Sequence, residues 1–314
     1  MSLPLLSRRL IFATGKGGVG KSTVALALGL AGARAGLRTI VVDLEGDGDP
    51  HETELAPGLF RLSVDPQSAM EEYLTVKVPG PAAHVLRQSR LFHTFAMATP
   101  GMRELLCIGK LWELAQFERR TPDADAFDLV VVDAPASGHG AAILRTPRTF
   151  AEIARVGPIA HQARTIADTI ADPAFTAVVA VSTPEEMPVN ETLELSERLS
   201  AGPEPLELQA VILNARYPDR FTAAEAAHMD SAASAAADTA PEAATPLQLA
   251  LAEHRRAETQ REQERRLRES FGDRLMVLPF LFERSLRLPE LERLARELER
   301  TGGDPASASK EQTP

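Results

Sequence analysis

The feature that most constrains the fold is a glycine-rich segment near the start of the chain, Gly15–Ser22, which reads GKGGVGKS. It follows the apolar run Arg9–Thr14 and precedes the Ala- and Leu-rich run Ser22–Ala35, which gives the order strand, loop, helix. Glycines let backbone N–H groups turn inward around phosphate oxygens, and the positive end of the helix adds to this attraction. The pattern predicts a phosphate-binding loop. A glycine turn with a chance lysine is the weaker interpretation.

Individual residues around this loop have separate expected roles in binding ATP and Mg²⁺. Lys21 would hold the β- and γ-phosphates, and Ser22 would ligate Mg²⁺. Asp133 ends an apolar strand and would hold the Mg²⁺ shell through water, although it could also be an ordinary strand-end acid. The predicted nucleotide-binding residues of the loop are Gly15, Lys16, Gly17, Gly18, Val19, Gly20, Lys21, Ser22 and Thr23.

Short β-rich runs recur along the chain, and most are apolar throughout rather than alternating. That pattern predicts strands buried on both faces, as in a mostly parallel sheet covered by helices. Helical patterns separate these runs, so we expect a doubly wound α/β fold with the loop in its centre. The expected helices include Ser22–Ala35, Glu185–Leu199 and Leu286–Arg300. The expected strands are Leu10–Ala13, Thr39–Asp43, Leu129–Asp133, Ala177–Ser182, Leu208–Asn214 and Leu275–Leu278.

Two segments interrupt this alternation. Residues 65–120 are predicted to form a helical insertion between the second and third strands, with more large apolar side chains than a connector needs. Those side chains either form the insertion's own core and its packing on the sheet, or line a groove for an apolar client segment. Residues 219–271 are also helical in pattern and are a further contributor to this subdomain.

Within the second segment, Pro241 and Pro246 are expected to break an Ala-rich stretch, and Leu247–Phe271 to form one strongly charged helix. We expect residues 1–314 to form a single domain, with 302–314 as a disordered tail.

Composition limits the compartment and the partners. The formal net charge of −10 disfavours a general nucleic-acid binder, which needs a basic face. The one cysteine, Cys107, excludes an internal disulfide and a paired-cysteine zinc site. No apolar run is long enough to span a bilayer, and Met1–Arg9 lacks the order of a secretory signal. We expect a cytoplasmic protein without a stable membrane anchor.

The second residue of the loop, Lys16, is not needed by an ordinary phosphate-binding loop. The full string GKGGVGKST resembles the signature-lysine branch of P-loop ATPases with a deviant Walker A motif, which includes ArsA, MinD, ParA and the Get-pathway ATPases. The resemblance implies that Lys16 crosses a dimer interface to the partner's nucleotide, in a homodimer or in a heterodimer with a paralogue. A cation that arrives only on closure would act like an arginine finger. A solvated loop lysine is the alternative.

The segment that begins at Asp133 reads DAPASGHG and closely resembles the second switch of ArsA and Get-type ATPases. MinD and ParA proteins usually lack its Gly-His pair, and Ile143–Pro147 continues the match. The resemblance implies that His139 couples loss of the γ-phosphate to a loop movement. A turn histidine without a role is the alternative.

The segment after the second expected strand reads LEGDGDP and lies where the resembling families begin their first switch. Aligned by the strand end, Glu45 takes the place of the family's water-orienting aspartate, with Asp47 and Asp49 as rivals. A glutamate can orient water, although its extra methylene changes its reach. A solvated acidic turn is the remaining interpretation.

The resemblance also implies a site for the adenine base. Asn214 closes its strand where these families place an asparagine whose amide offers a donor and an acceptor. Pro279 and Phe280 follow the last strand, where the family places a proline-bearing loop against the base. Strand-end capping and plain packing are the alternatives.

Together these motifs predict a Mg-ATP-dependent dimeric ATPase switch of the ArsA/Get-like group, which couples ATP binding and hydrolysis to movement of the helical subdomain and to a protein client. One alternative is a partner subunit with weak hydrolysis in a heterodimer. A motor for an anion or metalloid pump is disfavoured by the missing cysteines. A ParA- or MinD-type partitioning ATPase would need a basic DNA-binding surface or a C-terminal amphipathic membrane helix. It is disfavoured because no such anchor is evident in Leu288–Arg300 or the polar tail, although a local basic patch stays open.

Overall fold

The centre of the protein is an eight-stranded sheet in the order β3-β4-β2-β5-β1-β6-β7-β8. The computed structural model describes residues 3–44, 48–77, 89, 94, 98–119, 121, 124–154, 157–201, 205–236 and 241–302. All pairings are parallel except that of β3 with β4. The strands are β1 (Leu10–Gly15), β2 (Thr39–Asp43), β3 (Thr53–Ala56), β4 (Leu59–Ser63), β5 (Leu129–Ala136), β6 (Thr176–Ser182), β7 (Leu208–Arg216) and β8 (Leu275–Pro279).

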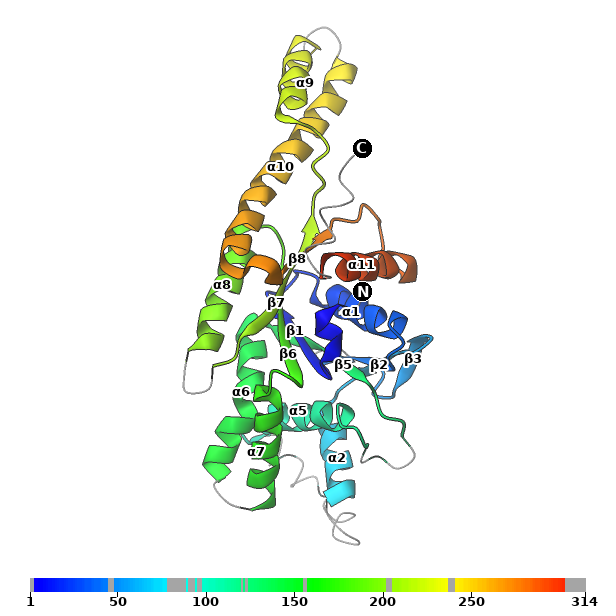
Figure 1. Ribbon diagram of the computed structural model, residues 1–314, viewed down its shortest axis with the longest axis vertical. Coiled ribbons are helices and arrows are strands. Elements are labelled where there is room, and N and C mark those ends of the chain that lie inside the picture. Colours follow the sequence, from blue (N-terminus) through cyan, green and yellow to red (C-terminus); the bar gives the residue numbers. More distant parts are fainter. Residues whose placement is uncertain are drawn as a thin grey trace.

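Helices cover both faces of this sheet, which confirms the doubly wound α/β fold (Figure 1). Side-chain alternation along β1 sends Leu10 and Phe12 into one buried cluster and Ile11 and Ala13 into the other. The Ile11 cluster includes side chains of α1 (Lys21–Arg34) and α11 (Leu288–Thr301). The Phe12 cluster includes side chains of α5 (Met102–Leu114), α6 (Ser137–Ala154), α7 (Pro158–Ala171), α8 (Glu186–Ser200) and the end of α10 (Pro241–Phe271).

The six expected strands are all present, but the hairpin of β3 and β4 was not predicted. Its two strands are joined at Pro57 and Gly58, and Gly58 has a φ of +78° that favours glycine. β3 has three exposed residues and one half-buried residue, so its sequence carries no apolar pattern. The hairpin extends the sheet beyond β2 and places β4 directly beside it.

The segment 65–120 holds α2 (Pro66–Lys77) and α5, and its described residues contain no strand, as expected. Buried α5 side chains such as Ile108 and Leu111 belong to the same core as the sheet. That residues 65–120 form a separate subdomain therefore stays a prediction. Phe95 and the other large apolar residues between 78 and 97 lie outside the described residues.

The segment 219–271 forms a long hairpin of α9 (Ala223–Ala236) and α10, which projects from the body (Figure 1). The break expected at Pro246 was wrong, because α10 continues through it for 31 residues. A proline near the helix start removes only one backbone bond, and the following turns pack against α9. Pro241 instead begins the helix. A residue in the first turn of a helix has no intrahelical partner for its N–H, so a proline there removes no hydrogen bond.

The described chain ends at Gly302, so residues 303–314 of the expected tail lie outside the described residues. Among the described helices, none combines the length and apolar character that a membrane crossing requires.

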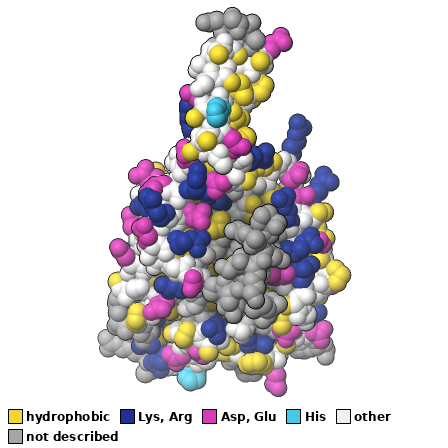
Figure 2. Space-filling view, turned by 45° about the horizontal axis from the view of Figure 1, so that its top comes forward, with side chains coloured by type: hydrophobic (Ala, Val, Ile, Leu, Met, Phe, Trp, Pro, Cys, Tyr) yellow, Lys and Arg dark blue, Asp and Glu magenta, His cyan; other side chains and the backbone are white. Residues whose placement is uncertain are grey.

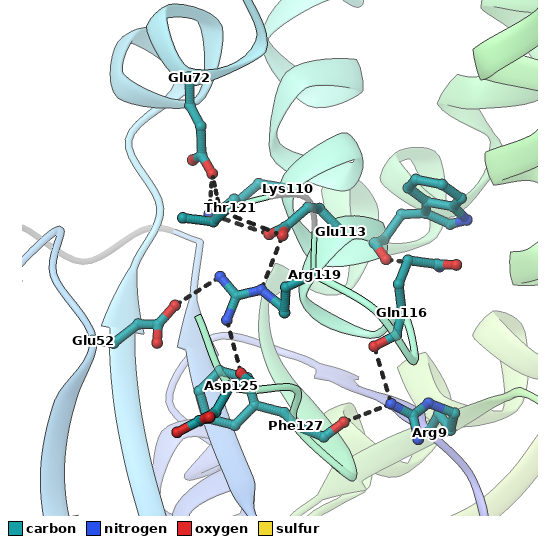
Figure 3. A network of polar contacts seen from close by, with 11 residues as sticks. Arg9, Glu52, Glu72, Lys110, Glu113, Gln116, Arg119, Thr121, Asp125 and Phe127 are labelled. Atoms are coloured by element: carbon teal, nitrogen blue, oxygen red, sulfur yellow. Dashed lines mark hydrogen bonds and ion pairs between the residues drawn. The ribbon is translucent and has the colours of Figure 1, made fainter. Parts of the chain in front are cut away.

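A buried ion-pair network attaches the segment before β3 to the end of α5 (Figure 3). The Arg119 side chain is only 1% exposed and lies between Glu113 Oε1 at 2.9 Å and Glu52 Oε1 at 2.8 Å. Lys110 Nζ bridges Glu72 at 2.7 Å and Glu113 at 3.3 Å. Burial alone would raise the pKa of Glu113, but hydrogen bonds from Arg119 and Lys110 hold it below its usual value.

We expect Arg119→Leu to lower the free energy of unfolding by about 3–5 kcal/mol, because it leaves the Glu113 carboxylate buried without its main partner. Urea unfolding followed by circular dichroism measures this change. Arg103→Leu on the exposed side of α5 is the matched control, with an expected effect within about 0.5 kcal/mol. Equal losses for the two variants would contradict the assigned role of the network.

Candidate functional site

The glycine-rich loop leaves the sheet where β1 ends between β5 and β6, at the point where the strand order reverses. Gly15 has a φ of +155°, and a Cβ there would lie 2.1 Å from the carbonyl oxygen of Val181. Gly20 has a φ of +88°, and its Cβ would lie 2.4 Å from Nδ2 of Asn214. Glycine is therefore required at both ends of the loop. The open space beside Gly17 and Gly18 lets a ligand approach the backbone.

Helix α1 begins at Lys21, directly after the loop, so its N-terminal N–H groups face the same space. Lys21 Nζ donates a hydrogen bond to the Lys16 carbonyl at 3.2 Å and so folds back over the loop. This arrangement gives the loop a cation and several N–H donors, which is the chemistry that binds phosphate.

Two carboxylates meet at the adjoining strand ends. Asp133 on β5 lies opposite Asp43 on β2, is 9% exposed and accepts a hydrogen bond from Ser22. Burial raises the pKa of Asp133, and Asp43 raises it further, against the opposing effects of Ser22, Lys21 and Arg61. The structure thus brings Ser22 and Asp133 together.

Asp43 and Arg61 were not predicted as part of this site. Arg61 Nη2 lies 3.2 Å from Asp43 Oδ2. Asp43 could have been found from its position at the end of an expected strand. The carboxyl ends of parallel strands meet at one edge of the sheet, so Asp43 lies beside Asp133. Arg61 could not be found because it lies on the unpredicted strand β4.

Lys16 forms an ion pair within the same chain. Its Nζ lies 2.6 Å from Oε1 of Glu191 on α8, and the two side chains are 28% and 32% exposed. No local sequence signal identifies Glu191, because 175 residues separate it from Lys16. Arg145 on α6 positions the same helix from its other end, because its Nη2 donates to the carbonyls of Arg198, Leu199 and Ala201.

Of the residues expected at the base end, Asn214 contacts the phosphate loop, and Pro279 and Phe280 contact the end of β7 just beyond Asn214. Asn214 Nδ2 donates to the Val19 carbonyl at 2.9 Å. Pro279 pairs with Arg216 at the end of β7, and the Phe280 N–H donates to the Arg216 carbonyl at 2.8 Å. Tyr217 stacks on Phe280 with ring centroids 4.6 Å apart and was not predicted.

Three expected switch residues remain untested by this geometry. Glu45 and Asp47 lie outside the described residues, and His139 lies in the first turn of α6 with its side chain outside the description. Asp49 is described, and its carboxylate accepts from the His51 N–H at 2.9 Å, which closes a turn before β3.

The strand–loop–helix site at the switch point of a parallel sheet defines a P-loop nucleotide-binding fold. The chain belongs to the anion-transporting ATPase family, whose model matches residues 8–168. It is 31% identical to ATPase BagA of Mycobacterium tuberculosis over 228 residues, which cover 67% of this chain and 66% of BagA. It is 26% identical to the arsenical pump-driving ATPase of Acidiphilium multivorum over 250 residues, or 69% of this chain and 40% of that relative. The matched region therefore spans just under two thirds of BagA and a smaller share of the pump ATPase.

We expect Asp133→Asn to stabilise the ligand-free protein at neutral pH. The pKa of Asp133 is higher in the folded than in the unfolded protein. The wild type therefore loses free energy of unfolding as the pH rises from the unfolded pKa through the folded pKa. The amide carries no charge, so the gain of the variant should vanish near pH 4, grow with pH and then level off. Urea unfolding from pH 4 to pH 8 with a chelator and without nucleotide measures it. A gain that is the same at every pH would contradict this account.

Proposed function

We propose that the chain is a Mg²⁺-dependent ATPase switch that works as a dimer and couples ATP binding and hydrolysis to a protein client. The observation that carries the proposal is the cluster of Lys21, Ser22 and Asp133 around the loop Gly15–Gly20. Membership of the anion-transporting ATPase family supports the same reaction. The proposal places the protein in the cytoplasm, where ATP is supplied.

Ser22 and Asp133 fit a Mg²⁺ ion. Both offer hard oxygen donors, which Mg²⁺ prefers, and they already lie within hydrogen-bonding distance of each other. Burial is the main cause that raises the pKa of Asp133, and the neighbouring Asp43 carboxylate adds to it, so a bound cation would favour the ionised form. In the proposal Ser22 ligates the ion directly and Asp133 holds it through water. When bound, Mg²⁺ neutralises charge on the phosphate oxygens.

The other residues of the site bind and orient the nucleotide. Lys21 leaves the Lys16 carbonyl for the β- and γ-phosphates, while loop N–H groups contact the phosphate oxygens. Asn214 uses its donor on Val19, which leaves Oδ1 to accept from the adenine amino group, beside Pro279 and Phe280.

Water activation and the response to hydrolysis are assigned to the two switch segments. Glu45 is proposed to orient the attacking water, with Asp47 as the rival, because Asp49 already closes its own turn. His139 is proposed to link γ-phosphate loss to the start of α6.

The dimer is proposed from Lys16. Its ion pair with Glu191 is partly exposed, so breaking it costs at most about 1 kcal/mol. Lys16 can therefore exchange Glu191 for the γ-phosphate in a second subunit, where the charge is larger and water is excluded. Either a second copy or a paralogue would supply that subunit.

The proposed client would bind the helical region 65–120. Packing accounts for the described large apolar residues of this region that are buried, namely Met70, Leu74, Leu105, Ile108, Leu111, Trp112 and Leu114. Phe117, just after α5, is 73% exposed and is the described residue there that a client could reach.

Two alternatives remain. The first alternative is a partner subunit with weak hydrolysis in a heterodimer, which is favoured by the glutamate at position 45 in place of the family aspartate. A metalloid-pump motor is disfavoured, because the one cysteine, Cys107, is buried and burial raises its pKa to about 12.

Lys21→Ala should reduce ATP turnover by roughly 100-fold or more, because the loop then lacks its β/γ-phosphate cation. Phosphate release and calorimetric ATP binding measure the effect. Arg293→Ala removes one positive charge from an exposed position on α11 and should leave both unchanged. A folded Lys21→Ala variant with wild-type turnover would overturn the ATPase proposal at this loop.

Mixing Lys16→Ala and Lys21→Ala subunits should restore activity that neither has alone. In a mixed dimer the Lys16→Ala subunit keeps an intact phosphate loop and receives Lys16 from its partner. Turnover and sedimentation velocity, with and without ATP, test this. Full wild-type activity in a strict monomer at all concentrations would exclude the role in trans.

A further inference from the structure

The chain is strained directly after the proposed adenine-reading residue. Ala215 has a φ of +61° and is the one non-glycine residue with positive φ in the part of the chain that the structure describes. This conformation costs an alanine about 1–2 kcal/mol and persists only where the surroundings enforce it. It separates Asn214, which contacts the phosphate loop, from Arg216 and Tyr217, which contact α10.

Polar contacts from α10 enforce that turn. The Tyr217 N–H donates to Oε1 of Gln260 at 2.7 Å, and Gln260 is only 5% exposed. Arg216 Nε lies 3.1 Å from Glu264, and its Nη2 contacts Asp219. Two successive residues of β7 and its extension are thus held by side chains one turn apart on α10.

An aromatic cluster joins the segment that begins at Pro279 and Phe280, which we call the base loop, to the contacts of Tyr217 with α10. Tyr217 stacks on Phe280 at 4.6 Å, and Phe282 packs edge-on against both rings at 5.5 Å and 4.9 Å. The Arg256 guanidinium of α10 lies over the Tyr217 ring at 5.0 Å. A base placed against Phe280 would therefore press on a cluster that includes α10.

Beyond these contacts α10 leaves the body as an arm, which we define as Ala223–Ala236 with residues 241–255 (Figure 1). A small cluster of Ala226, Ala233 and Leu251, with Met229 and Leu247, packs its two helices together. Figure 2 shows the arm projecting from a charged body, with hydrophobic side chains along one of its sides. The arm is therefore a packed pair of helices. It is attached to the body through the contacts of Arg216 and Tyr217 with α10, which we call the joint, and through the ion pair of Arg220 with Glu253.

We propose that this joint makes the arm respond to the base of the bound nucleotide, so that an adenine nucleotide repositions the arm and phosphate alone does not. The proposal rests on the nucleotide site of the proposed function. Gln260 and Tyr217 are positioning residues of the nucleotide site, because they act on the base through the base loop and do not touch it themselves. By linkage, whatever holds the arm in its ATP position also strengthens binding of the base.

The test measures the distance between the arm and the body by pulsed electron paramagnetic resonance. Spin labels are attached to Leu249→Cys on the arm and Arg293→Cys on α11, both exposed. The native Cys107 is buried and its pKa is raised to about 12, so it does not compete for the label. We expect a shifted distance with Mg²⁺ and a non-hydrolysable ATP analogue, and no shift with Mg²⁺ and inorganic tripolyphosphate. The body pair Ala174→Cys and Arg293→Cys is the control and should not shift.

Gln260→Leu removes the acceptor for the Tyr217 N–H while keeping the size of the side chain. It should abolish the shift and weaken ATP binding about 3- to 10-fold, with tripolyphosphate binding unchanged. Gln263→Leu is the same change on the same helix, at a residue bonded to Arg266 instead, and should behave as the wild type. Tyr217→Ala, which removes the stacked ring, replaces Gln260→Leu if the latter does not fold.

The possible failures are distinct. Calorimetric binding of ATP with an arm that does not shift, or an equal shift with tripolyphosphate, overturns this inference and leaves the proposed function intact. A wild-type protein that binds neither ligand overturns the proposed function, and this inference with it.

Discussion

The close approach of Gly15 to the carbonyl of Val181 is the contact on which the site depends. Because β1 lies between β5 and β6, the chain can leave the sheet at that point only without a side chain. The same exit sets where α1 begins, and hence where Lys21 and Ser22 lie relative to Asp133. A local requirement for glycine thus determines the geometry of residues more than a hundred positions apart.

That geometry places like charges together at a cost to the ligand-free chain. Asp43 and Asp133 meet at neighbouring strand ends, and Arg61 offsets part of their repulsion. Arg61 reaches this position because β4 adds to the sheet beside β2. The small hairpin therefore has an electrostatic role besides extending the sheet. Burial and this repulsion both disfavour the ionised form of Asp133, and a bound cation would relieve both.

Much of the fold could be predicted because its signals are local. Apolar runs marked six strands, and the loop marked the site, since both patterns are read within a few residues. The hairpin of β3 and β4 was missed because the exposed β3 lacks an apolar pattern. The pairing of Lys16 with Glu191 and of Tyr217 with Gln260 depends on how distant elements pack, which no spacing records. Pro246 shows the reverse case, in which packing against α9 overrides a local helix breaker.

The length of α10 gives the joint at its base a mechanical consequence. A helix of 31 residues is about 46 Å long, and Gln260, Glu264 and Arg266 in its final half contact the end of β7 and α8. Leu267 and Phe271 fix that half in the main core, so it cannot slide freely. The outer half is held by α9 through a few small side chains and by exposed ion pairs such as Arg255 with Asp230. The ion pair of Arg255 with Asp230 moves with the arm, whereas that of Glu253 with Arg220 also ties the outer half to the aromatic cluster, because Arg220 lies over the Phe282 ring. A small change at Gln260 therefore becomes a larger displacement at the tip.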